Sequence, residues 1–326
     1  MFFKFYKLEC AALVFMLLSC TPHGNNPNEI DFYFGQKPND TLPEVFAPGI
    51  ISFGNHEHHL TFMPDYSELF YVVADKYRKQ HIIISRKRDN MQWSKPEVAT
   101  FSGYYSDFAP SPTPDGKYLL FCSNRPLPGD TAEVGDFNIW KVYKNANGWS
   151  TPEPLPFPVN DETNEYNPSI SANGNLYFQD HDEAGIDIYL SLLIYGNYTQ
   201  PEKLSEAINS IYPEIGPWVS PDESVLWFSS DRPKSFGSMD IYYSTKDSSG
   251  NWIDAINAGE KINSLYGDAI PTLSPDQKQL FFVSFRPIEI SLKNKNFIEI
   301  LSLLNSPENG DGTIYWVSPK IIEQLE

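Results

Sequence analysis

Short, largely apolar runs recur along the chain, and each follows a compact polar turn. The runs are 69–73, 118–121, 176–178, 225–228 and 279–283, and their turns end at Asp65, Asp115, Asn173, Asp222 and Asp276. Proline in such a turn presets φ, and aspartate bonds its own backbone. A tight turn between short apolar runs is typical of a β-hairpin, so the pattern predicts five hairpins.

Two further strand-like segments follow the hairpins, most clearly in the middle of the chain. The third strand reads Asn-Ile-Trp at 138–140 and Asp-Ile-Tyr at 187–189 and 240–242. The fourth combines an aromatic residue with Pro96, Pro152 or Pro201. Proline suits an edge strand, because its missing N–H costs no ladder bond there. Four strands per repeat, with the last at the rim, predict an all-β fold of the β-propeller type.

The number of turns sets the expected number of blades. Five turns predict five four-stranded blades, with a six-bladed propeller as the alternative. Segments 42–47 and 315–322 both resemble a fourth strand. Either one could therefore be the outermost strand of the blade that closes the ring.

The repeats share a motif beyond their turns. After the second, fourth and fifth hairpins the chain reads Ser-Asn-Arg-Pro at 123–126, Ser-Asp-Arg-Pro at 230–233 and Ser-Phe-Arg-Pro at 284–287. With the Ser-Pro-Asp turn and the Asp-Ile-Tyr strand, this motif resembles the WD40-like PD40 repeat of TolB-like propellers and of many Bacteroidetes lipoproteins. The first repeat departs from it, with Asp75 in place of arginine, and the third lacks both the proline and the arginine.

The N-terminus has the pattern of an export signal. Lys4 and Lys7 precede the apolar run 11–18, which is too short to span a bilayer, since a spanning helix needs about 20 apolar residues. The run ends in Leu-Leu-Ser-Cys at 17–20, which resembles the bacterial lipobox. That resemblance implies cleavage before Cys20, lipid on its sulfur, and an anchor in the outer membrane, on its periplasmic face or at the cell surface. We expect a signal peptide at 1–19, a tether at 20–33 and the propeller at 34–326.

Composition narrows the possible partners. The formal net charge is -18, which argues against nucleic acid, because phosphate binding depends on clustered Lys and Arg. An envelope protein or a glycan is the expected partner. Of the three cysteines only Cys122 lies in the folded part, so it has no partner for an intramolecular disulfide and is expected to be a buried apolar residue.

One acidic residue precedes each turn by the same number of positions. Counting back eight residues from the five turn residues reaches Glu57, Asp107, Glu165, Glu214 and Asp268. Equal offsets predict equivalent places on the innermost strands, and therefore a ring of carboxylates at one mouth of the channel. Crowded carboxylates raise one another's pKa and need an offsetting partner. Pairing with Arg125, Arg232 and Arg286 or with backbone N–H groups is one interpretation; Ca²⁺ or Mg²⁺ on the channel axis is the other.

A histidine cluster at 56–59 is the second candidate site. On a regular strand His56 and His58 would face one side, and Glu57 and His59 the other. His56 and His58 with a carboxylate could ligate a transition metal, and oligogalacturonate lyases, which resemble this repeat family, use a histidine-rich metal site inside a propeller. A histidine cluster at the surface or the channel mouth without metal is the alternative interpretation.

Two functions follow from these features. The first is a non-catalytic binding or scaffold module at the cell envelope, because the sequence contains neither a nucleophile elbow nor a phosphate-binding glycine loop. The second is a metal-assisted polysaccharide lyase or glycoside hydrolase at the channel mouth. No catalytic residue can be named from the sequence, and the first function is preferred.

Overall fold

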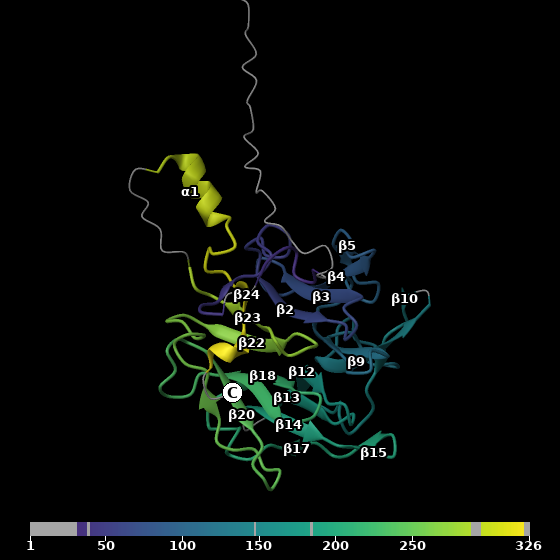
Figure 1. The fold of residues 1–326 in the computed structure, drawn as a ribbon. Coiled ribbons are helices and arrows are strands. Elements are labelled where there is room, and N and C mark those ends of the chain that lie inside the picture. The colour runs from purple at the N-terminus through teal and green to yellow at the C-terminus, as the bar shows by residue number, and fades with distance from the viewer. Residues whose placement is uncertain (1–30, 38–39, 147, 183–184, 288–294, 323–326) are drawn as a thin grey trace, which may run out of the picture. The chain divides into compact units, whose positions relative to one another are not determined.

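The computed structural model describes residues 31–37, 40–146, 148–182, 185–287 and 295–322. The chain divides into Met1–Asp31 and Phe32–Glu326. The second unit consists of five main antiparallel sheets arranged around a common channel (Figure 1). The all-β, five-bladed propeller expected from the turns is thereby confirmed, and the six-bladed alternative is wrong.

Each blade has four strands, and in blades I to IV the first strand in chain order lies next to the channel. Blade I contains β2 (Glu57–Phe62), β3 (Glu68–Ala74), β4 (His81–Asp89) and β6 (Glu97–Val98). Blade II contains β7 (Asp107–Pro112), β8 (Tyr118–Ser123), β9 (Asn138–Asn145) and β11 (Glu153–Pro154). Blade III contains β12 (Asn164–Ile170), β13 (Leu176–Asp182), β14 (Gly185–Ser191) and β17 (Glu202–Lys203). Blade IV contains β18 (Glu214–Val219), β19 (Val225–Ser230), β20 (Asp240–Thr245) and β21 (Ile256–Asn257).

Short hairpins extend three of these blades at the rim. They are formed by β5 (Gln92–Trp93), β10 (Gly148–Trp149), and the pair β15 (Leu193–Ile194) and β16 (Asn197–Tyr198). β5 pairs with β4, and β10 pairs with β9.

Blade V is completed from both ends of the described chain. It contains β22 (Asp268–Leu273), β23 (Leu280–Ser284), β24 (Thr313–Val317) and, at its outer edge, β1 (Glu44–Val45). Glu44 lies opposite Trp316 and Val45 opposite Tyr315. Segment 42–47 therefore supplies the closing strand. The alternative, that segment 315–322 is the outermost strand of this blade, was wrong. That segment contains the end of the third strand, β24, and the 3-10 helix η1 (Pro319–Ile321).

Three aromatic residues before β1 hold the N-terminal segment against the propeller. Phe32 stacks on Tyr66 with ring centroids 4.0 Å apart, Tyr33 lies 5.2 Å from Trp316, and Phe34 stacks on Trp93 at 5.7 Å. We call Phe32, Tyr33 and Phe34 the aromatic clasp. The packed part of the chain thus starts two residues before the expected position 34.

Every innermost strand carries a β-bulge at the same place. The register shifts after the second residue of β2, β7, β18 and β22, and at the corresponding place in β12. The residue at the bulge is left-handed in all five blades: His59 (φ 51°), Ala109 (52°), Asn167 (52°), Gly216 (61°) and Ile270 (57°). In blades II to V a proline follows. A bulge breaks the alternation of side chains, so two successive residues can face the channel.

The hydrophobic core lies between the blades. Each cluster joins two neighbours, for example Phe70 and Val72 of blade I with Phe121 and Trp140 of blade II. The cluster between blades V and I contains Phe46, Phe62, Phe281 and Trp316 and so closes the ring. Burying one large apolar side chain contributes about 1.5–3 kcal/mol, and each blade interface buries several.

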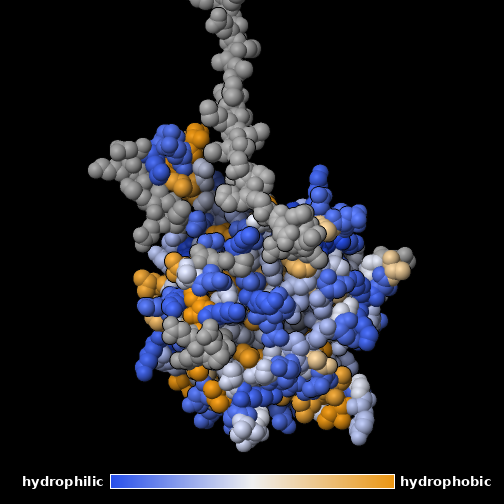
Figure 2. All heavy atoms as spheres, in the orientation of Figure 1, coloured by the Kyte–Doolittle hydropathy of each residue, from blue (hydrophilic) through white to orange (hydrophobic). Residues whose placement is uncertain are grey.

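Within the described residues, one α-helix interrupts the all-β pattern. The insertion between β23 and β24 contains α1 (Phe297–Leu304), which begins at a capping box of Asn296 and Glu299. No residue of α1 is buried, and Phe297 and Ile298 are each 70% exposed. Figure 2 shows hydrophobic atoms at the surface in the region of this helix. In the part of the chain that the structure describes, no helix has the length and apolar character needed to cross a membrane.

Candidate functional site

The channel contains a cavity at the end where the innermost strands begin. Its volume is about 240 Å³, and all five blades contribute to its wall. Five histidines line it, together with three aromatic rings: His56, His58, His59, His81, His181, Phe108, Tyr166 and Phe285. We call this space the histidine cavity.

The bulge explains how so many rings reach one place. His58 and His59 are consecutive, and both line the cavity because His59 occupies the left-handed bulge position. The expectation that His59 faces away from His56 and His58 was therefore wrong. Glu57 does turn away and is buried inside blade I.

Hydrogen bonds connect three of the histidines in a chain. His58 Nδ1 contacts His59 Nδ1, and His58 Nε2 lies 3.1 Å from His81 Nδ1. At the ends, His59 Nε2 donates to Asn167 Oδ1 at 2.8 Å and His81 Nε2 donates to the Arg78 carbonyl at 3.2 Å. Three neutral imidazoles carry only three N–H groups, so at most three of these four contacts are hydrogen bonds at the same time. The contact with Arg78 is exposed, so it is the one that water can replace.

The cavity is electrically neutral near pH 7. Burial lowers the pKa of His59 to about 3 and holds the pKa of His58 well below its ordinary value. Burial also lowers the pKa values of His56, His81 and His181. Among the described residues that line the cavity there is no Asp, Glu, Lys or Arg.

A row of amides forms the polar side of the cavity. Asn167 Nδ2 donates to Gln179 Oε1 at 2.8 Å, and the N–H of Gly216 donates to the same oxygen at 3.2 Å. Gln179 Nε2 donates to His181 Nε2 at 2.6 Å. Because the Gly216 N–H fixes which end of Gln179 is the oxygen, it also fixes the orientation of Asn167. The amide groups are therefore held in one arrangement.

Sequence reasoning missed the other polar and aromatic side chains of this wall: His81, Phe108, Tyr166, Asn167, Gln179, His181 and Phe285. His81 and His181 belong to different strands of different blades, β4 and β13, so no common spacing links them to the cluster at 56–59. A signal was present for His181, which stands at the same offset from its turn as Ser123, Ser230 and Ser284.

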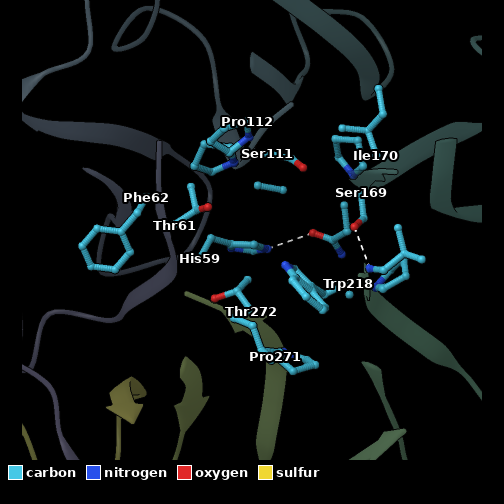
Figure 3. A pocket seen from close by; sticks show the side chains of 18 of the residues that line it. His59, Thr61, Phe62, Ser111, Pro112, Ser169, Ile170, Trp218, Pro271 and Thr272 are labelled. Atoms are coloured by element: carbon cyan, nitrogen blue, oxygen red, sulfur yellow. Dashed lines mark hydrogen bonds between the residues drawn. The ribbon is translucent and has the colours of Figure 1, made fainter. Parts of the chain in front are cut away.

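A second cavity lies beyond the bulges, toward the turns that follow the innermost strands. Its volume is about 140 Å³, and Figure 3 shows Thr61, Ser169, Trp218 and Thr272 around it. Prolines such as Pro112 line much of the rest, so we call it the proline cavity. The hydrogen bond between His59 and Asn167 crosses the boundary between the two cavities, because both residues line both spaces.

The five expected ring carboxylates occupy equivalent places near the start of the innermost strands. All are buried: Glu57, Asp107, Glu165, Glu214 and Asp268 are 0–1% exposed. None of them lines the histidine cavity or the proline cavity. The residues that follow them in the chain line the histidine cavity instead: His58, Phe108, Tyr166, Ile215 and Ala269.

Three of the carboxylates pair with the arginine of their own blade. Arg125 Nη2 lies 2.7 Å from Asp107, Arg232 Nη2 lies 2.7 Å from Glu214, and Arg286 Nη2 lies 2.6 Å from Asp268. Each Nη2 also donates to a backbone carbonyl, that of Phe101, Ile208 or Ile262. These contacts match the pairing interpretation. An axial Ca²⁺ or Mg²⁺ stays a prediction.

Metal binding by the histidines also stays a prediction. His56 and His58 line one cavity with ring centroids 5.0 Å apart. Within the described ranges, no group of three or more His, Cys, Asp or Glu side chains is placed to hold a metal ion.

Comparisons with known proteins complete the description. No family model and no curated protein matches this sequence. Among solved structures, TolB from Acinetobacter baumannii is 15% identical with a TM-score of 0.47, and the match covers 81% of this chain and 55% of that one. This chain thus spans little more than half of that protein's length.

Two further solved structures are similar over most of their own length. Putative TolB from Agrobacterium tumefaciens is 17% identical with a TM-score of 0.48, and the match covers 81% of this chain and 90% of that one. An alpha-L-arabinofuranosidase from Lactobacillus brevis is 11% identical with a TM-score of 0.49, and the match covers 83% of this chain and 92% of that one. At these identities the likeness concerns the fold, and TolB-like propellers are among the structures with which it is shared.

Proposed function

We propose that this chain is an exported binding protein of the cell envelope that holds a segment of a neutral glycan in the histidine cavity. The observation that carries the proposal is the wall of this cavity, where aromatic and imidazole rings from several blades meet fixed amide groups. Binding sites for small molecules are mostly apolar and contain a few placed polar groups. Sugar rings present both kinds of surface, with apolar C–H faces and hydroxyl edges.

The charge of the wall selects the class of glycan. A buried charge is costly unless it is paired, and the described wall offers no charged side chain as a counterion. The histidines do not provide a positive charge, because burial lowers their pKa values. A neutral sugar therefore suits the cavity better than a uronate or a phosphorylated sugar.

Export and anchoring rest on the sequence. Cys20 and the expected signal peptide at 1–19 lie outside the described residues, so the lipid anchor is part of the proposal. An anchored propeller with a ligand cavity and no recognisable catalytic motif fits a receptor or scaffold. A basic envelope protein is the other partner compatible with the net charge of -18.

Calorimetric titration of the purified full chain with neutral and uronate oligosaccharides tests the proposal. We expect binding of at least one neutral oligosaccharide, and a loss of about tenfold or more in Tyr166→Ala, since truncating an aromatic ring removes stacking contacts in the wall. The matched control is Thr61→Ala in the proline cavity, which should bind normally. Equal binding by both variants, or binding of uronates alone, would contradict the proposal.

A metal-assisted lyase or hydrolase is the second candidate. The observation that favours it is the meeting of His56 and His58 with His81 in one cavity. Elemental analysis of the protein as isolated distinguishes the two functions. One transition-metal ion per chain, lost in His58→Ala, would favour the enzyme; a metal-free protein that binds glycan without turnover would favour the receptor.

A further inference from the structure

Among the described residues of blade III, no arginine or lysine pairs with the buried carboxylate as an arginine does in three other blades. In blades II, IV and V an arginine stands 18 residues after the acid: Arg125, Arg232 and Arg286. At this offset from Glu165 the sequence has Glu183, so an acid replaces the base.

Blade I also lacks the arginine but satisfies its acid in another way. Glu57 accepts hydrogen bonds from the backbone N–H groups of Phe53, Gly54 and Asn55 at 3.1–3.2 Å, and from Thr313 Oγ1 at 3.2 Å. These donors offset part of the burial that raises the pKa of Glu57. Both carboxylate oxygens of Glu57 thus accept hydrogen bonds without an arginine.

Glu165 has no comparable set of donors. It is 0% exposed, and its Oε2 is buried without a hydrogen-bond partner. From the described residues, its Oε1 accepts a 3.4 Å contact from the N–H of Asp161 and a 3.2 Å contact from Thr163 Oγ1. An unpartnered buried carboxylate oxygen is costly.

Three carboxylates converge on the hydroxyl of Thr163. Its Oγ1 lies 2.8 Å from Asp161 Oδ1, 2.7 Å from Asp180 Oδ1 and 3.2 Å from Glu165 Oε1. A hydroxyl has one proton to donate, so at most one of these contacts is a hydrogen bond from Thr163. The shortest contact is the one with Asp180, so the 3.2 Å contact with Glu165 places oxygen lone pairs against each other. A proton on Glu165 or a nearby cation would remove this repulsion.

We propose that blade III binds one Ca²⁺ at this point, with Glu165 and Asp180 as its acidic ligands. The ion takes the place that the guanidinium group holds in blades II, IV and V. The Thr163 hydroxyl and the carbonyl of Val159, which stands at the same offset as the arginine-bound carbonyls of Phe101, Ile208 and Ile262, are the neutral oxygens available to it. Asp161 is exposed, so the site has an entrance from solvent and water can complete the shell.

The chemistry of the donors selects the ion. Hard oxygen donors favour Ca²⁺ and Mg²⁺, and Ca²⁺ accepts irregular shells whereas Mg²⁺ demands a near-ideal octahedron. Two carboxylates and neutral oxygens from a loop and two strands form an irregular set, which suits the more tolerant ion. Without a cation, burial together with Asp161 and Asp180 raises the pKa of Glu165 to about 9, so the alternative state of the site is protonated.

Equilibrium dialysis of the purified full chain against Ca²⁺, with Mg²⁺ in parallel, measures the site directly. We expect one Ca²⁺ per chain at pH 7.5 and weaker binding of Mg²⁺. Saturation with Ca²⁺ should raise Tm by about 2 °C or more, because a ligand that binds only the native state stabilises it. Glu165→Gln should abolish both effects.

The matched control is Glu214→Gln in blade IV, where Arg232 fills the equivalent place. It should lower Tm but bind Ca²⁺ like the wild type. If Glu165→Gln does not fold, Asp180→Asn provides the same comparison. A wild type that binds no Ca²⁺, or a Glu165→Gln variant that binds it as tightly as the wild type, would overturn the proposal and leave Glu165 as a protonated acid.

Discussion

Single buried ion pairs connect the strands within a blade. Asp107 is fully buried, and the side chain of Arg125 is only 10% exposed. The guanidinium group also bonds the carbonyl of Phe101, so it joins the end of β8 to the loop that precedes β7. Removing one partner of such a pair leaves the other charge buried and unpaired, which is strongly destabilising.

We expect Arg125→Ala to lower the free energy of unfolding by about 3 kcal/mol, because Asp107 would lose its counterion in a fully buried site. Chemical denaturation measures the change. Lys117→Ala is the control, since Lys117 pairs with Asp115 at the surface with 77% of its side chain exposed, and exposed pairs contribute at most about 1 kcal/mol. Equal losses in both variants would show that the buried pair has no special role.

The histidine cavity should make stability depend on pH. Burial lowers the pKa of His59 to about 3 in the folded chain, whereas in the unfolded chain it is about 6.5. Between these values the unfolded state binds the extra proton, so stability falls as the pH falls.

Urea unfolding of wild type and His59→Gln between pH 7.5 and 5.5 tests this dependence. We expect the wild type to lose about 1.4 kcal/mol more than the variant over this range. Taking the difference cancels the other titrating groups, including Glu165, whose raised pKa acts in the opposite direction. Parallel pH profiles for the two proteins would contradict the expectation.

At the residue scale, the sequence predicted where a side chain lies along its strand better than it predicted which way the side chain points. Equal offsets from the turns put the five acids at equivalent places, as found. Which side chains reach the channel depends on the bulges, because a left-handed residue at His59 or Asn167 lets neighbours in sequence face the same way. Strict alternation, the only rule available for a strand whose partner is unknown, assigns His59 to the opposite side.

At the scale of elements, the closing strand is short. β1 contributes two residues to the sheet, and Phe46 follows it, donating its N–H to the Ile314 carbonyl at 2.8 Å. The ring of Phe46 is 0% exposed and packs 5.1 Å from Phe281 and 5.2 Å from Trp316. The ladder is thus reinforced by packing.

Phe46→Ala should therefore lower the free energy of unfolding by about 3 kcal/mol or more, the usual cost of truncating a buried phenylalanine. Guanidinium denaturation measures the loss. Leu42→Ala, at a position 60% exposed in the same segment, should stay within about 0.5 kcal/mol of the wild type. A tolerated Phe46→Ala would mean that the ring closes without this contact.

The sequence predicted the repeated elements and missed the irregular one. Turn residues such as Asp222 make their hydrogen bonds with close neighbours in the chain, so a turn can be recognised from the sequence. Asp222 accepts hydrogen bonds from Ser220 and Ser224 within its own turn. Helix α1 occurs once, so comparing the repeats could not find it. The strand order of the closing blade was also hard to predict, because its third strand, β24, follows an insertion and not a tight turn.

At the scale of the whole molecule, the expected lipid anchor decides where the propeller works. Mass spectrometry of the protein purified from bacterial membranes should find a mature N-terminus at Cys20 carrying acyl groups. Cys20→Ala should leave the protein unprocessed or release it from the membrane, because stable anchoring requires the acyl chains. A mature N-terminus elsewhere without lipid would refute the assignment.

The aromatic clasp has a mechanical consequence for a protein held by its N-terminus. Without the clasp, tension on the tether would reach β1 first and peel a two-residue ladder one bond at a time. The clasp lies between the tether and this strand, and Arg88 lies over the ring of Phe32 at 4.5 Å while Arg86 lies over that of Phe34 at 5.4 Å. A pull therefore has to detach three packed rings from blades I and V before it loads the strand that keeps the ring closed.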